Sequence, residues 1–101
     1  FAAFAESYPG GPLTVTALFE RAEALRQLGD TKGQAQSYLD AYNADPEGPR
    51  APEALLALGR SLADLGQMNE ACVMLSEVGA RFPRSQAAAD AANTMQGLQC
   101  Q

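Results

Sequence analysis

The chain has 101 residues, 47% of them apolar, which is enough for one domain with a packed core. The formal net charge is −5 and the Lys and Arg residues form no cluster, so the composition argues against binding to nucleic acid or to an anionic membrane surface. No apolar run approaches the length of a membrane-spanning helix, and we expect no such helix.

The first nine residues, FAAFAESYP, have the pattern of the second half of a helix whose beginning lies upstream. No signal peptide is recognisable at Phe1. We therefore interpret the chain as part of a longer protein.

A repeat is visible in the spacing of prolines. Pro9, Pro46 and Pro83 are separated by two equal intervals of 37 residues, from 9 to 46 and from 46 to 83. A proline cannot continue a helix, because it lacks the N–H group and its ring crowds the preceding turn. The period predicts an all-α solenoid of antiparallel helix hairpins. The predicted parts of this single domain are the end of a preceding helix at 1–9, a repeat at 11–46, a repeat at 48–83 and a capping helix at 85–101.

The first complete helix is predicted to run from Pro12, a residue favoured at the first helical position, to Leu28, with Gly29 as a left-handed cap. Asp30 is expected to cap the second helix, which ends before Pro46. Helical spacing places the buried face of the first helix on Leu18, Ala22, Leu25 and Leu28. The buried face of the second helix is expected on Ala35, Tyr38, Leu39, Ala41 and Tyr42.

The loop PEGPRAP restarts the pattern, and Gly66 is expected to cap the third helix. The tail begins at Ser85, a good N-cap, and has the alanine-rich profile of a terminal helix that packs on one neighbour. The buried face of the third helix is expected on Leu55, Leu58, Gly59, Leu62 and Leu65, and that of the fourth on Ala71, Leu75 and Val78.

Cys72 and Cys100 allow two interpretations. They are either reduced thiols, one of them buried in a helix interface, or a disulfide that ties the C-terminal helix to the helix before it. The two cysteines lie at different distances along the chain from the turn at Pro83. A bridge therefore requires the last residues to unwind or fold back, and we expect Gly97 to allow that bend. A zinc site is not expected, because two sulfurs without a histidine cannot complete a zinc shell.

The small and large residues within each period resemble the tetratricopeptide pattern. The first helix of each repeat carries a small residue, a large apolar residue and a glycine at matching positions; these are Ala22, Leu25 and Gly29, then Gly59, Leu62 and Gly66. Gln34 departs from the pattern, which has alanine at that position. The resemblance implies that the first helix of each pair lines a concave, protein-binding surface.

The order of the parts also resembles the C-terminal domain of a narrower family, the cell division coordinators of the Tol-Pal system known as YbgF or CpoB. The resemblance rests on F..F...YP at the start and on AP.ALL.LG.SL..LGQ..EAC..L.EV..RFP.S in residues 51–85. It implies a periplasmic protein that has a signal peptide and a trimerising coiled coil upstream of Phe1, so that homo-oligomers form. It also implies binding to TolA, with a peptidoglycan synthase complex as a further partner, and a link between peptidoglycan synthesis and outer-membrane constriction during division. A periplasmic location favours the disulfide interpretation of Cys72 and Cys100.

The sequence contains no histidine, so the usual general base of an enzyme is missing. Pairs of carboxylates such as Glu20 with Glu23 are interpreted as solvated charges on helix faces, and the serines lack an activating base. We therefore expect a binding module with no enzymatic activity, no cofactor, no metal and no small-molecule substrate.

The inward positions that the resemblance implies are the candidates for partner binding. They are Thr16, Phe19, Glu20, Glu23 and Gln27 from one repeat, Glu53, Leu56, Ala57, Arg60 and Asp64 from the next, and Asn93 from the terminal helix. Phe19 is either an anchor for a partner helix or extended peptide, or a core residue that packs on Phe1 and Phe4. The acidic residues suit a basic or mixed-charge partner. Capture of a C-terminal carboxylate is not expected, because only Arg60 and Asn93 are suited to it.

Two other functions are compatible with the sequence. One is a lipoprotein subunit of outer-membrane protein assembly, whose repeats also end in an aromatic residue and proline. The other is a domain of an enzyme whose catalytic part lies elsewhere. The upstream sequence separates the first from the leading interpretation, because a lipidated cysteine favours the lipoprotein and a coiled coil favours the coordinator.

Overall fold

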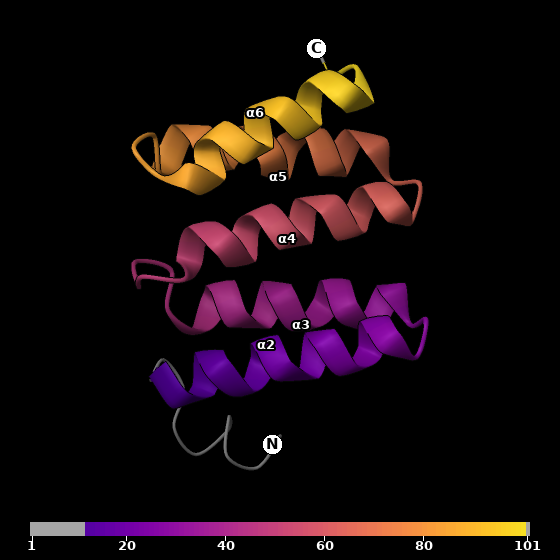
Figure 1. The fold of residues 1–101 in the computed structure, drawn as a ribbon, viewed down its shortest axis with the longest axis vertical. Helices are drawn as coiled ribbons and strands as arrows, with labels where there is room; N and C mark the ends of the chain where they lie inside the picture. Colours follow the sequence, from indigo (N-terminus) through magenta and orange to yellow (C-terminus); the bar gives the residue numbers. More distant parts are fainter. Residues whose placement is uncertain (1–11, 101) are drawn as a thin grey trace.

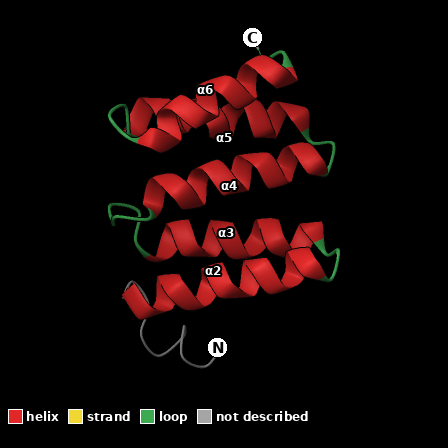
Figure 2. Cartoon of the chain, in the orientation of Figure 1, coloured by secondary structure: helices red, strands yellow, loops and turns green. Residues whose placement is uncertain are grey.

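The computed structural model describes residues 12–100, which form helices joined by short turns and contain no strand (Figure 2). The helices are α2 (Pro12–Gln27), α3 (Thr31–Ala44), α4 (Ala51–Asp64), α5 (Met68–Arg81) and α6 (Gln86–Leu98). They stack in chain order, and each described helix contacts the next one along the chain (Figure 1). Helix α6 lies over α5 and also contacts α4. The described residues are therefore an α-solenoid of two antiparallel hairpins covered by a C-terminal helix, as predicted.

The predicted turn residues end and begin the helices. Gly29 and Gly66 have φ angles of +79° and +82°, a left-handed conformation in which other residues are strained. The Asp30 carboxylate accepts a hydrogen bond from the Gly33 N–H at 2.9 Å, and the Ser85 hydroxyl accepts one from the Ala88 N–H at 3.1 Å. Both N-caps were predicted from the sequence, so the helix boundaries follow from local chemistry.

One predicted core position is wrong. Helix α2 ends at Gln27, and Leu28, which was expected on its buried face, is 80% exposed. Gln27 is the last residue of α2, and Leu28 already belongs to the turn at Gly29. The helical spacing therefore no longer sets the direction of the Leu28 side chain.

The core consists of two neighbouring apolar clusters. One lies between α3, α4, α5 and α6 and includes Leu55, Leu58, Leu75 and Val78, and the other lies between α2, α3 and α4. Gly59 lets α4 pack closely on Leu75 of α5, because a Cβ atom at Gly59 would lie 2.8 Å from two side-chain atoms of Leu75. The small residue expected at this position therefore has a packing role.

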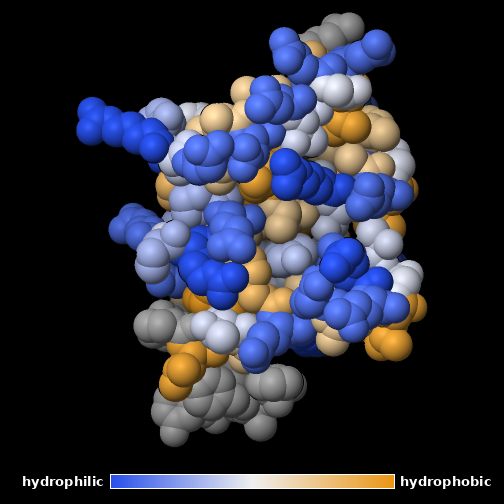
Figure 3. All heavy atoms as spheres, viewed as in Figure 1, coloured by the Kyte–Doolittle hydropathy of each residue, from blue (hydrophilic) through white to orange (hydrophobic). Residues whose placement is uncertain are grey.

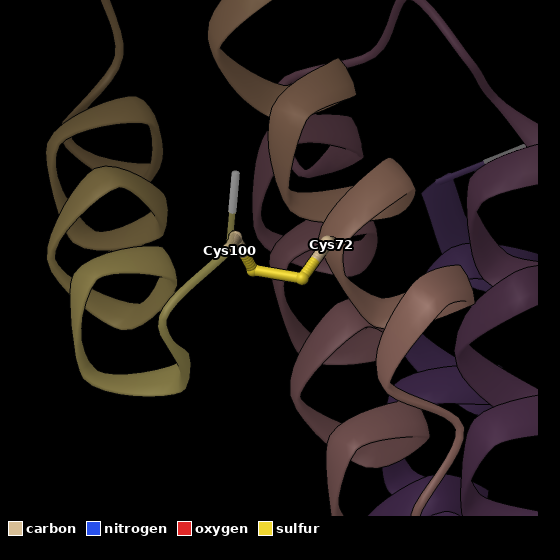
Figure 4. Close-up of a disulfide and its surroundings, with 2 residues drawn as sticks. All are labelled: Cys72 and Cys100. Carbon is tan, nitrogen blue, oxygen red and sulfur yellow. A yellow bond between two sulfur atoms is a disulfide. The ribbon is translucent and has the colours of Figure 1, made fainter.

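A disulfide joins Cys72 on α5 to Cys100, which follows α6, with the Sγ atoms 2.02 Å apart. Figure 4 shows the bridge spanning the space between α5 and the segment after α6. The chain folds back as the bridge requires, but it does so at Gln99, which has a φ of +60°, while Gly97 remains within the helix. The expectation that Gly97 supplies the bend is therefore wrong, and the first residue beyond the helix supplies it.

Helix α6 is attached by a thin apolar contact. Ala91 is its buried residue, and Ala87, Ala88, Met95 and Leu98 are partly buried against the larger cluster. Within the described residues, α6 packs on α5 and α4. The disulfide adds a covalent attachment near the C-terminal end of this helix.

Within residues 12–100, no helix is long and apolar enough to cross a membrane. The predicted end of a preceding helix at residues 1–9 lies outside the described residues, as do Phe1 and Phe4.

Candidate partner-binding surface

One side of α4 forms a hollow together with α3, and we call this hollow the α4 groove. Its volume is about 340 Å³. The groove is lined by Gln34, Tyr38, Glu53, Leu56, Ala57, Arg60, Ser61 and Asp64. The five positions that the sequence predicted from the second repeat, namely Glu53, Leu56, Ala57, Arg60 and Asp64, all contribute to it. The structure therefore brings these residues together on one surface.

The α4 groove has an apolar floor and a charged rim. Leu56 is 7% exposed and Tyr38 is half-buried, whereas the side chains of Glu53, Arg60 and Asp64 are exposed. The hydroxyl of the buried Ser61 donates a hydrogen bond to the carbonyl of Ala57 at 2.9 Å, so its polar group is satisfied within α4. The groove can therefore accept apolar atoms at its base and charged groups at its edge.

The Tyr38 hydroxyl, at the edge of the groove, senses both burial and nearby charges. The pKa of the Tyr38 hydroxyl is raised, first because the ring is partly buried and then because the negative charges of Glu23 and Glu53 disfavour the phenolate. Glu23 belongs to α2 and does not line the groove, and its partner Arg26 acts on the pKa of Tyr38 in the opposite direction. The pKa of the Glu23 carboxyl is itself lowered, because the Arg26 guanidinium donates hydrogen bonds to it at 2.7 and 2.8 Å.

Arg60 connects the groove to the capping helix. Its Nε and Nη2 atoms each lie 3.3 Å from the Thr94 hydroxyl oxygen, which accepts both hydrogen bonds. The Thr94 hydroxyl in turn donates to the carbonyl of Asp90 at 2.9 Å, which directs its lone pairs toward Arg60. Asn93, the predicted site residue on α6, is exposed beside Thr94. Helix α6 therefore positions Arg60 at the α4 groove.

Phe19 lies in the core of the described residues, as one of its two predicted roles has it, while the predicted packing on Phe1 and Phe4 lies outside the described residues. Its side chain is 9% exposed, and its ring packs edge-on against Tyr38 with the centroids 5.5 Å apart. The Arg50 guanidinium carbon lies 3.7 Å from the ring centroid, and Arg50 also pairs with Glu53 at 3.3 Å. The ring of Phe19 is therefore covered and is not an accessible anchor in this structure.

The remaining predicted positions on α2 do not line the α4 groove. Glu20 and Gln27 are exposed, and Thr16 lines a separate small cavity of about 90 Å³ at the turn between α3 and α4.

A second hollow, of about 260 Å³, lies on the opposite side of α4, and the sequence did not predict it. Leu55 and Leu58 reach it because they project away from Leu56 and Ala57 around the helix. The hollow is lined by Leu39, Tyr42, Leu55, Leu58, Val73, Met74, Glu77 and Arg81. The signal available in the sequence was Val73, an apolar residue off the predicted face of α5, which is 55% exposed.

At the edge of this second hollow, Arg81 is held in place by its neighbours. Its Nη1 atom donates to the Tyr42 hydroxyl at 2.8 Å and its Nε atom donates to the Glu77 carboxylate at 2.5 Å. These contacts raise the pKa of Arg81, with the Glu77 hydrogen bond as the largest cause. The edge of the second hollow therefore carries a paired acid and base.

The face of the solenoid on which α6 lies in front of α5 is mainly hydrophilic, with smaller apolar areas between the polar side chains (Figure 3). This mixture alone does not mark a binding surface, because bulk apolarity does not distinguish protein interfaces from the rest of a protein surface.

Comparison with known families supports the repeat assignment. The family described as tetratricopeptide repeat matches residues 53–85, which hold most of α4, all of α5 and the turn to α6. A comparison with curated proteins found no match. Together with the all-helical hairpin architecture, the family match identifies a tetratricopeptide-type helical repeat fold, and repeats of this type commonly act as protein-interaction modules.

Proposed function

We propose that this domain is a protein-binding scaffold of the Tol-Pal system in the bacterial periplasm, where it binds TolA and coordinates peptidoglycan synthesis with outer-membrane constriction during cell division. The observation that best supports protein binding is the α4 groove, which is lined by five of the predicted inward residues and lies on a repeat fold. The narrower assignment is supported by the sequence resemblance in residues 51–85.

The disulfide between Cys72 and Cys100 supports the proposed compartment. Disulfides form and persist in oxidising environments such as the bacterial periplasm and are rare in the cytosol. The bridge should stabilise the position of α6 in particular, because Ala91 is the buried residue of this helix and the apolar contact that holds it to the rest of the domain is small.

The proposal is tested by titration calorimetry of the 101-residue chain with the periplasmic part of TolA. Ala57→Arg puts a long charged side chain into the α4 groove, and Ala80→Arg puts the same side chain on an exposed position of α5. We expect Ala57→Arg to weaken binding by at least about tenfold, as substitutions within an interface centre do, and Ala80→Arg to leave it unchanged.

The matched pair separates blocking of the groove from a general effect of added charge. Circular dichroism should give equal helical content for both variants, since both positions are helical and neither is fully buried. Absence of heat and of any binding isotherm with the unsubstituted chain, at concentrations up to hundreds of micromolar, would remove TolA as the partner.

A further inference from the structure

We propose that the Cys72–Cys100 disulfide is a redox-sensitive latch, which holds Arg60 in place at the α4 groove through helix α6. When a dithiol reduces the bridge, α6 is released from α4 and Arg60 loses its position. The latch is a property of the domain itself. Its consequence for binding, which is a weaker affinity for the partner after reduction, rests on the proposed function.

Helix α6 is attached to the domain mainly at its two ends. The turn at Pro83 joins its N-terminal end to α5, and the disulfide ties Cys100, just beyond its C-terminal end, to Cys72 on α5. Between these ends the apolar contact is small, because Ala91 is the buried residue of the helix. Opening of the bridge therefore frees the C-terminal end of α6 while the turn keeps the helix tethered, which makes a local opening the expected response.

The bridge is open to thiol–disulfide exchange, because Cys72 and Cys100 are both only partly buried. The reductant is a dithiol, such as the cysteine pair of a thiol oxidoreductase. One of its thiolates attacks one sulfur of the bridge, and the other cysteine leaves as a thiolate. The second thiolate of the reductant then attacks the mixed disulfide and releases the remaining cysteine. Two electrons pass to the bridge, the two protons of the dithiol end on Cys72 and Cys100, and the reductant becomes a disulfide.

The position of Arg60 depends on α6. The Nε and Nη2 atoms of Arg60 donate to the Thr94 hydroxyl at 3.3 Å, and these long, exposed hydrogen bonds contribute little stability by themselves. Thr94 is fixed by its own helix, because its hydroxyl donates to the carbonyl of Asp90, one turn earlier, at 2.9 Å. Once α6 moves, the two donors of Arg60 have no fixed acceptor, and its long side chain regains rotamer freedom.

The release of Arg60 changes the α4 groove. Arg60 lies four residues after Leu56 and four residues before Asp64, and all three line the groove. With α6 in place, the guanidinium is directed toward α6. With α6 released, it can turn toward Asp64, at the helical spacing that allows an ion pair, and enter the groove. A partner that binds the reduced domain must first order Arg60 again, which costs affinity.

The first test uses the domain alone. Nuclear magnetic resonance follows the Arg60 Nε–Hε signal of the isotope-labelled chain before and after dithiothreitol, without denaturant. We expect complete reduction, a shift of this signal and retention of the folded amide signals of α2 to α5. The Nε–Hε signal of Arg26, which is paired with Glu23 on α2, is the internal control and should not move.

Three results of this test would overturn the latch. Reduction that proceeds only after urea is added would mean that the bridge is closed to exchange in the folded domain. Loss of the folded amide signals of α2 to α5 on reduction would mean that the bridge holds the whole domain and not α6. An unchanged Arg60 signal after reduction would mean that Arg60 does not depend on the bridge.

Variants of Thr94 separate the loss of the Arg60 contact from a loss of stability. Thr94→Val is close in shape and leaves the bridge intact, but it removes the hydroxyl that accepts from Arg60. In the oxidised chain it should shift the Arg60 signal in the same direction as reduction does. Thr94→Ser keeps the hydroxyl and should restore the position found in the unsubstituted oxidised chain. An Arg60 signal that is unaffected by Thr94→Val would contradict the proposed coupling.

Titration calorimetry with the periplasmic part of TolA tests the consequence for binding. Reduction and Thr94→Val should each weaken binding at least about fivefold, the lower end of typical coupling between two sites. If TolA binds the oxidised and the reduced chain equally well, control of binding by the latch is wrong and the partner stands. If TolA does not bind while the Arg60 signal responds to reduction, the partner is wrong and the latch stands.

Discussion

Removing the Cys72–Cys100 disulfide should lower the free energy of unfolding by about 3–4 kcal/mol, the value that loop-closure entropy gives for a bridge across 28 residues. The bridge restricts the unfolded chain between α5 and the segment after α6. For a domain of this size, the loss is a large share of the total stability.

The loss should be concentrated at the end of the solenoid. Ala91 is the buried residue of α6, so this helix has little apolar contact with which to stay attached once the bridge is gone. Hydrogen exchange of the α6 amides should become faster than that of the α4 amides. The Arg60–Thr94 hydrogen bonds would open in the same event, because Thr94 moves with α6.

Urea unfolding of the Cys72→Ala/Cys100→Ala variant, beside the unsubstituted chain with and without reductant, measures this effect. The reduced chain and the double variant should unfold at nearly the same urea concentration, since both lack the bridge. A shift in unfolding free energy below about 1 kcal/mol would show that the bridge does not restrict the unfolded state as the loop-closure estimate requires.

Leu75→Ala should destabilise the domain by about 2–5 kcal/mol, because it removes a fully buried leucine and leaves a cavity between α4 and α5. Leu75 is 1% exposed and fills the space opposite Gly59. Val73→Ala is the control on the same helix. Since Val73 is 55% exposed, its truncation should cost less than about 1 kcal/mol.

A double substitution tests whether Leu75 and Gly59 are packed as the structure indicates. In the unsubstituted chain, Gly59→Ala should destabilise, because the added Cβ would lie 2.8 Å from atoms of Leu75. In the Leu75→Ala background the same change should stabilise by up to about 1 kcal/mol, because the clash is gone and alanine is the better helix former. Additive effects of the two substitutions would contradict the close contact.

The hairpin architecture and its turns were predictable from the sequence because short-range chemistry determines them. Gly29 and Gly66 have the left-handed conformation that a helix end favours, and Asp30 and Ser85 make the N-cap hydrogen bonds expected of them. The repeat spacing of the prolines predicted where the helices end. These features depend on a few neighbouring residues, so no knowledge of distant contacts was needed.

The second-repeat half of the candidate site was also predictable, because it lies on one face of a single helix. The spacing of Glu53, Leu56, Ala57, Arg60 and Asp64 puts them on one side of α4 whatever the neighbours are. The spacing could not predict that Tyr38 of α3 also lines the groove, because this depends on how α3 packs against α4.

The errors arise where long-range packing decides. The place where the chain bends back toward Cys72 is set by the position of α5, so it is Gln99 and not Gly97 that has the left-handed conformation. The role of Phe19 stayed open for the same reason, because the position of Arg50, whose guanidinium carbon lies 3.7 Å from the ring centroid, cannot be inferred from helical periodicity.

The most direct test of the account is to map the contact surface of the periplasmic part of TolA on the isotope-labelled domain by nuclear magnetic resonance. The account predicts that the largest shifts fall on side chains of the α4 groove, such as Ala57 and Arg60, with little change at Val73 and Met74 in the hollow on the opposite side of α4. Shifts concentrated at Val73 and Met74, with the α4 groove unaffected, would contradict it.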